Sequence, residues 1–81
     1  MARLGFDPVP VWISASNCRI VSDVGEAARM LVEDWPDDFQ ASETHVAAKK
    51  ACLAALQGKG DIRAAREAFI EAAREAGLLE E

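Results

Sequence analysis

The stretch SDVGEAARMLVEDWP, residues 22–36, predicts an amphipathic helix together with its start and its end. Asp23, followed three residues later by Glu26, is a capping pair: the Asp side chain accepts from an early backbone N–H, and the Glu reaches back to the start of the helix. Ser22 is the alternative cap. The apolar residues that follow recur at steps of three and four, which is one stripe of a helix: Val24, Ala27, Ala28, Leu31, Val32 and Trp35.

The connection after this helix holds the most one-sided charge in the chain. Pro36 ends the helix, because a proline disfavours helical geometry at the residue before it. Trp35 lies on the apolar stripe, so it is predicted to be the last core residue of the helix. Phe39, a few residues later, is an aromatic without such a place in the pattern. Between positions 30 and 48 there is no Lys or Arg, yet five acids occur: Glu33, Asp34, Asp37, Asp38 and Glu43.

Two short β-prone runs precede the helix. Val9, Val11 and Ile13 alternate with the residues between them, which is the two-residue period of a strand with one buried face. Pro10 indicates an edge strand, since it cannot donate to a ladder. A second run at residues 18–21 follows the turn-prone sequence SASN, so an antiparallel hairpin is expected. Two strands are not stable alone in water, and helices must therefore pack on one face.

Trp12 alternates with the buried side of the first strand and is expected to point to the other face of the hairpin. If helices cover only one face, Trp12 is exposed and is a candidate contact for a partner, for example in a homodimer. The alternative is that a helix, or the N-terminal segment with Leu4 and Phe6, covers the ring, since large aromatics are usually mostly buried.

A second helix is predicted after the acidic connection, over residues 43–57. Ser42 caps its start, and Gly58 ends it as a left-handed stop. Besides many alanines, it carries three larger apolar residues: Val46, Leu53 and Leu56.

A third helix is predicted over residues 62–76. Asp61 caps its start, Gly77 ends it, and Leu78 is placed to fold back onto the last turn. The residues expected to face inward share one stripe: Ile62, Ala65, Phe69, Ala72 and Ala76.

The chain is therefore predicted to be one α+β domain over residues 1–81, an N-terminal two-stranded antiparallel hairpin packed against three helices in the order β-β-α-α-α. A chain of this length buries only about 60% of the surface that its unfolded form exposes. The many alanines allow helices to approach closely. Larger side chains must fill the remaining space: Trp12, Leu31, Trp35, Leu53, Phe69 and Ile70.

Composition argues against several classes of protein. The net charge is −5, and the excess acid lies in the first half, which argues against nucleic-acid binding because such a field repels phosphate backbones. The longest run without a charged residue, residues 8–18, is shorter than the roughly 18 residues of a membrane helix, and prolines interrupt any signal peptide. We therefore expect a cytoplasmic protein. Cys18 and Cys52 lie far apart, which favours free buried thiols over a redox pair or a metal site.

Candidate catalytic groups are few. His45 is the only histidine, and Cys52 lies two helical turns later, about 10 Å away by the helix rise. A nucleophile and its base need about 3 Å. Asp37 and Asp38 lack the alternating ligands and the central Gly of a calcium loop, so solvated charge is expected, with a weak divalent-cation site as the alternative. No catalytic residue, metal ligand or cofactor is predicted.

Four segments in this order, VPV, CRIVSDVGEAARMLVEDWP, AAKKACLAALQG and AREAFIEAAREAGLL, resemble a family of short bacterial proteins known as domain of unknown function 982. The similarity covers residues 6–79, and its most specific pieces are the helix that ends in Trp35 and Pro36, the segment from Cys52 to Gly58, and the run from Ala68 to Gly77. Phe6 stands where relatives often carry Trp. The resemblance implies a compact domain in a bacterial cytoplasm. It implies no activity, so no catalytic residue is carried over.

Two functions of different class remain. The preferred one is a non-enzymatic protein-binding or regulatory module, in which acids select a basic partner and aromatics anchor it. The alternative is a small-ligand or metal-binding protein, or an enzyme, with a pocket near His45 and the acidic connection. A homodimer is compatible with the first. The candidate contact residues of the preferred function are Trp12, Trp35, Asp37, Asp38 and Phe39.

Overall fold

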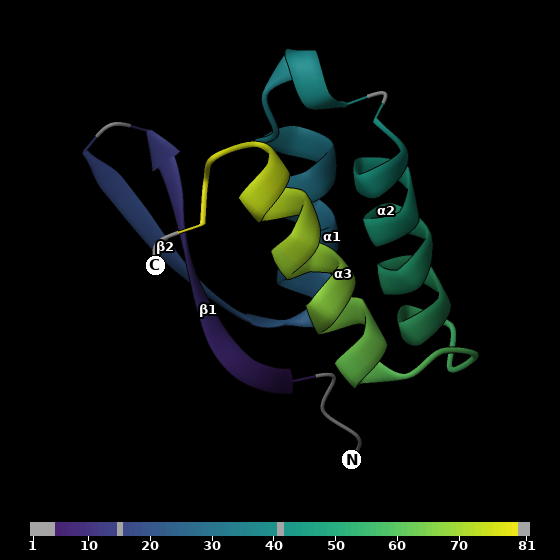
Figure 1. Ribbon diagram of the computed structural model, residues 1–81. Coiled ribbons are helices and arrows are strands. Elements are labelled where there is room, and N and C mark those ends of the chain that lie inside the picture. The colour runs from purple at the N-terminus through teal and green to yellow at the C-terminus, as the bar shows by residue number, and fades with distance from the viewer. Residues whose placement is uncertain (1–4, 15, 41, 80–81) are drawn as a thin grey trace.

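The computed structural model describes residues 5–14, 16–40 and 42–79, with the side chains of Ile13 and Ser14 left aside. It consists of a two-stranded antiparallel sheet followed by three α-helices (Figure 1). This confirms the predicted α+β fold and the order β-β-α-α-α. The elements are β1 (Gly5–Ser14), β2 (Asn17–Asp23), α1 (Val24–Glu33), a 3₁₀ turn η1 (Asp37–Phe39), α2 (Glu43–Leu56) and α3 (Ile62–Glu75).

The hairpin buries one face against the helices. Val9 pairs with Val21 across the two strands, and both side chains are buried together with Val11. The opposite face holds the pairs Pro10 with Ile20 and Trp12 with Cys18. In Figure 1 the three helices lie on one side of the hairpin, and α1 packs against β2 while α3 packs against β1. The predicted alternation of the first strand is confirmed at Val9 and Val11.

Each α-helix begins at the side-chain cap that the sequence predicts. The Asp23 carboxylate accepts from the Glu26 N–H at 2.7 Å, and Glu26 Oε1 accepts from the N–H of Ser22, one residue before the cap, at 3.3 Å, in a variant of the capping box. Ser42 caps α2 and Asp61 caps α3. Such caps satisfy backbone donors at helix starts that have no partner within the helix.

The last helix ends in a Schellman motif that brings the chain back to the sheet. Gly77 has a φ of 73°, and the Leu78 N–H donates to the Ala73 carbonyl at 2.8 Å, as predicted for a chain that folds back after a terminal glycine. The Leu78 carbonyl then accepts from the Trp12 N–H at 2.6 Å, and Leu79 forms a bridge with Val11. This returning segment runs beside β1 in Figure 1.

The inner face of α2 differs from the prediction. Leu53, which is predicted to fill space in the core, is 52% exposed; Leu56 is 41% exposed, and Val46 is only partly buried. Small residues let α2 lie close to α3, so the bulky leucines point outward. The residues of α2 that are buried instead are His45, Ala48, Cys52 and Ala55.

The core is therefore formed by fewer large side chains than expected. Phe69, Met30, Leu31 and the hairpin valines are fully buried, whereas Ile70 and Trp12 are only partly buried. Trp35 is 4% exposed, which confirms its predicted burial, although α1 ends at Glu33, before Trp35. Within the described residues, no helix is long and apolar enough to cross a membrane.

The burial of Phe69 on α3 and the exposure of Leu53 on α2 give a direct test of the core. Truncating the buried ring in Phe69→Ala is expected to lower the free energy of unfolding by about 3–5 kcal/mol, because burial is lost and a cavity remains. The matched variant Leu53→Ala, at an exposed position of α2, is expected to change it by less than about 1 kcal/mol. Urea unfolding followed by circular dichroism measures both. Equal losses would contradict the observed orientation of α2.

Candidate functional site

The acidic connection between α1 and α2 forms an exposed corner at one end of the molecule, at the top of Figure 1. Pro36 precedes the 3₁₀ turn, and Asp37 and Asp38 occupy the first positions of that turn with exposed side chains. Phe39 is half-buried and packs against the core. We call Asp37, Asp38 and Phe39 the acidic corner.

Trp35 lies beneath the acidic corner rather than in it. Its ring is 5.6 Å from the His45 ring and 5.8 Å from the Phe69 ring, measured between centroids. With 4% of its surface exposed, Trp35 cannot serve as the aromatic anchor for a partner that the sequence suggested. Its Nε1–H is buried without an acceptor among the described residues. Trp35 therefore supports the corner from the inside.

His45 holds the start of α2 against the end of α1. One ring nitrogen, Nε2, lies 2.8 Å from the Leu31 carbonyl oxygen, and the other, Nδ1, lies 2.9 Å from the Gln40 carbonyl oxygen. Leu31 belongs to the last turn of α1, where carbonyl oxygens have no N–H donor within the helix. The side chain is 1% exposed. His45 thus supplies a buried partner to a helix end and to the residue that follows the 3₁₀ turn.

This geometry leaves His45 no role toward a solvent-borne substrate. A neutral imidazole carries one N–H and donates to one of the two carbonyls, whereas only the doubly protonated ring donates to both. In either form both nitrogens face backbone oxygens inside the protein. The hypothesis of an enzyme or ligand pocket built on His45 therefore lacks an accessible imidazole.

Cys52 is also buried, two helical turns after His45 on the same face of α2. Burial raises the pKa of its thiol from 9.0 to about 11, because the charged thiolate is poorly solvated in the core. A thiol that remains protonated is a weak nucleophile and a weak metal ligand. Neither Cys52 nor Cys18, which is exposed rather than buried as expected, forms a disulfide.

Side-chain bonds fix the shape of the corner and connect it to α3. Gln40 Nε2 donates to the Trp35 carbonyl at 3.0 Å and to Asp37 Oδ1 at 3.2 Å, which closes the 3₁₀ turn on itself. Ser42 Oγ donates to Glu75 Oε1 at 2.7 Å, although the two residues lie far apart in the sequence. The C-terminal end of α3 consequently places the Glu75 carboxylate beside Ser42, at the start of α2.

A shallow groove runs between α2 and α3 at this end. Its volume is about 410 Å³. Ala47 and Ala68 are its small apolar lining residues, with Thr44 beside them, and Glu43 and Glu71 supply carboxylates. Arg74 pairs with Glu71 at 3.0 Å. We call this the α2–α3 groove.

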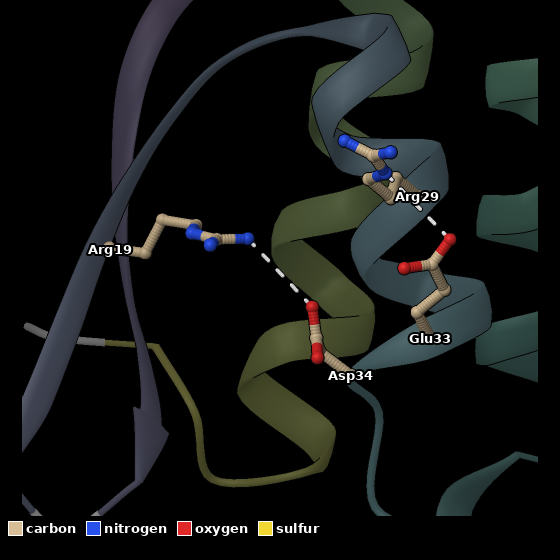
Figure 2. Close-up of polar contacts among 4 residues, drawn as sticks. All are labelled: Arg19, Arg29, Glu33 and Asp34. Carbon is tan, nitrogen blue, oxygen red and sulfur yellow. Dashed lines mark ion pairs between the residues drawn. The ribbon is translucent and has the colours of Figure 1, made fainter.

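The acids at the end of α1 differ from those of the corner. Arg19 of β2 reaches Asp34 at 3.7 Å, and Arg29 pairs with Glu33 at 3.7 Å (Figure 2). These exposed ion pairs contribute about 0–1 kcal/mol each, but they reduce the local negative charge. No ion pair to Asp37 or Asp38 occurs within the described residues. Asp37 and Asp38 therefore differ from Glu33 and Asp34 in that no arginine balances their charge among the described ion pairs.

Trp12, the remaining candidate contact, is partly buried on the face of the hairpin away from the core. Trp12 belongs to β1 and its N–H bonds the Leu78 carbonyl, whereas the acidic corner belongs to the connection between α1 and α2. Leu4, one of the predicted alternative covers for Trp12, lies outside the described residues. In the described part of the chain, no group of three or more His, Cys, Asp or Glu side chains could hold a metal ion.

The family described as "Protein of unknown function (DUF982)" matches residues 7–80. The chain belongs to this family. The resemblance seen in the sequence is thereby confirmed, and family membership adds no activity to the geometry above. No curated protein and no solved structure matches the chain.

Sequence reasoning missed two features of this DUF982 domain. The burial of His45 could have been suggested by its spacing to Ala48, Cys52 and Ala55, which forms one stripe, but the leucines offered a stronger apolar signal. The contribution of Glu75 had no local signal, because only the tertiary structure brings α3 to the corner.

The His45 bonds are tested by a change that keeps an aromatic ring. His45→Phe leaves the Leu31 and Gln40 carbonyls without this partner, and a buried unsatisfied group costs about 1–3 kcal/mol, so we expect a loss of about 2–4 kcal/mol in unfolding free energy. Lys50→Phe places the same ring at an exposed position of α2 and is expected to change stability by about 0.5 kcal/mol. Chemical denaturation at pH 7 compares the two. Wild-type stability in His45→Phe would refute the structural role.

The pKa of Cys52 predicts a loss of stability at alkaline pH. Because its pKa is raised on folding, the unfolded chain loses the thiol proton near pH 9 while the folded protein keeps it to about 11. The contribution is present below pH 9 and is lost as the pH rises toward 11. Between pH 8 and pH 10 the wild type should lose about 1 kcal/mol more than Cys52→Ala. Parallel pH profiles from urea unfolding would contradict the burial of the thiol.

Proposed function

We propose that this protein is a non-enzymatic binding module whose acidic corner and adjoining α2–α3 groove receive a basic segment of a partner protein. The observation that carries the proposal is the convergence of carboxylates from separate elements at one end of the molecule. Asp37 and Asp38 come from the 3₁₀ turn, and the Ser42–Glu75 hydrogen bond holds the end of α3 beside α2.

The surface has the features of a specific contact as well as charge. Phe39 is half-buried beside Asp38, so a partner can cover an aromatic edge while it neutralises carboxylates. The α2–α3 groove places Ala47 and Ala68 next to Glu43 and can accept the aliphatic part of a Lys or Arg side chain. Charge complementarity of this kind chiefly determines association rate and choice of partner.

A regulatory role in the cytoplasm is part of the same proposal. Two cysteines without a disulfide are consistent with a reducing compartment. The engaged ring of His45 and the protonated thiol of Cys52 favour a binding module over an enzyme, because neither group is placed to react with a bound molecule.

A titration with a synthetic peptide of alternating Lys and Ala residues tests the proposal. In ¹⁵N-NMR spectra we expect shifts at Asp38, Phe39 and Thr44, with affinity that falls as salt is added. Asp37→Asn combined with Asp38→Asn should weaken binding about ten-fold, which corresponds to roughly 1.4 kcal/mol.

The control is a double substitution that changes the net charge by the same amount but lies toward the other end of α3. Asp7→Asn combined with Glu67→Gln alters two acids that line a separate depression beside the start of α3. This variant should bind the peptide as the wild type does. Equal weakening in both double variants would show attraction to net charge alone, and unchanged binding in the Asp37, Asp38 variant would refute a role of the acidic corner.

A further inference from the structure

The two edges of the hairpin differ in how they are protected. At the outer edge of β1, Pro10 has no N–H, and the Trp12 N–H is bonded to the returning Leu78 carbonyl. Strand β2 has no proline or lysine in its sequence NCRIVSD, and no strand adjoins its outer edge among the described residues. An unprotected edge strand is a site at which another strand can pair.

The hydrogen bond from the Trp12 N–H to the Leu78 carbonyl indicates which backbone groups of β2 face outward. Because the Trp12 N–H points away from β2, Trp12 and Pro10 are the residues of β1 that do not exchange bonds with that strand. Their cross-strand partner Ile20 therefore turns its own N–H and carbonyl to the open edge. The Ser22 N–H, two residues after Ile20, also points away from β1, since it donates to the Glu26 side chain.

Ile20 is exposed in its side chain as well as in its backbone. The side chain is 54% exposed on the hairpin face away from the core, next to Pro10. No described residue bonds its N–H or carbonyl on the open side. A groove of about 430 Å³ lies beside the strand and is lined by Arg19, Asp23, Gly25, Glu26 and Arg29, so α1 does not cover the whole edge.

We propose that β2 pairs antiparallel with β2 of a second copy of this chain, around a two-fold axis at Ile20, to form a symmetric dimer with one continuous sheet. In this register the two Ile20 residues exchange backbone hydrogen bonds and cover each other's side chains. Arg19 lies opposite Val21 of the second copy and diagonal to Asp23 of the second copy, within reach of a long side chain.

The charge of the strand favours its own copy as the occupant. Arg19 and Arg29 are the only Lys or Arg residues between positions 5 and 48, and both line the groove beside β2. An antiparallel copy brings Asp23 toward Arg19 twice, once on each side of the axis. The contact is short, so it belongs to the small, transient class of interfaces.

Sedimentation equilibrium from about 10 µM to 1 mM, a range chosen for millimolar-to-micromolar dissociation constants, tests the dimer. The mass should rise from 8.7 kDa toward twice that value. Ile20→Pro removes an N–H that the hairpin does not use, so it should remain folded and monomeric over this range. Ile20→Thr keeps the N–H and loses apolar contact, so it should dimerise about ten-fold more weakly.

Amide exchange on the wild type provides a second measurement that does not depend on any variant. Protection of the Ile20 amide should increase with protein concentration, while the Val21 amide, which bonds within the hairpin, should stay protected throughout. A mass of 8.7 kDa at every concentration, or a dimer that Ile20→Pro leaves intact, would overturn the proposal. So would exchange at Ile20 that is independent of concentration.

Discussion

The contacts of one buried histidine with two backbone carbonyls hold in place the end of the molecule that carries the acidic corner. A helix that stops leaves carbonyls without partners, and burying them unpaired costs free energy. His45 meets the Leu31 carbonyl at the end of α1 and the Gln40 carbonyl after the 3₁₀ turn. Because both ends of the connection are held to one ring, the 3₁₀ turn that includes Asp37 and Asp38 is held at the surface. Asp37 and Asp38 are exposed for this reason.

The same ring explains why Trp35 belongs to the core. Trp35 packs against both the His45 ring and the Phe69 ring, and so fills the space that small residues leave between the helices. Ala48 and Ala55 allow α2 to approach α3, but they contribute little volume. A few large side chains from α1 and α3 must therefore provide most of the apolar contact. This arrangement places the leucines of α2 at the surface.

Features decided by local chemistry were predictable from the sequence, and features decided by tertiary packing were not. Asp23, Ser42 and Asp61 cap helices because side-chain and backbone groups a few residues apart satisfy each other. The inner face of α2 could not be read in this way, since alanines occur all around that helix and its leucines suggested the wrong side. For the candidate site, Asp37, Asp38 and Phe39 are adjacent in sequence. Glu75 reaches Ser42, at the start of α2, only through the packing of α3.

The proposed dimer and the proposed binding surface use different parts of the fold. The acidic corner follows α1, whereas the open edge of β2 is flanked by Arg19 and Arg29, so self-association there does not require the most acidic surfaces to meet. Repulsion between two chains of net charge −5 opposes association, and the two arginines lower it locally. A dimer of this kind carries two acidic corners that remain accessible. A partner with two basic segments would then gain affinity through linked binding, which a monomer cannot provide.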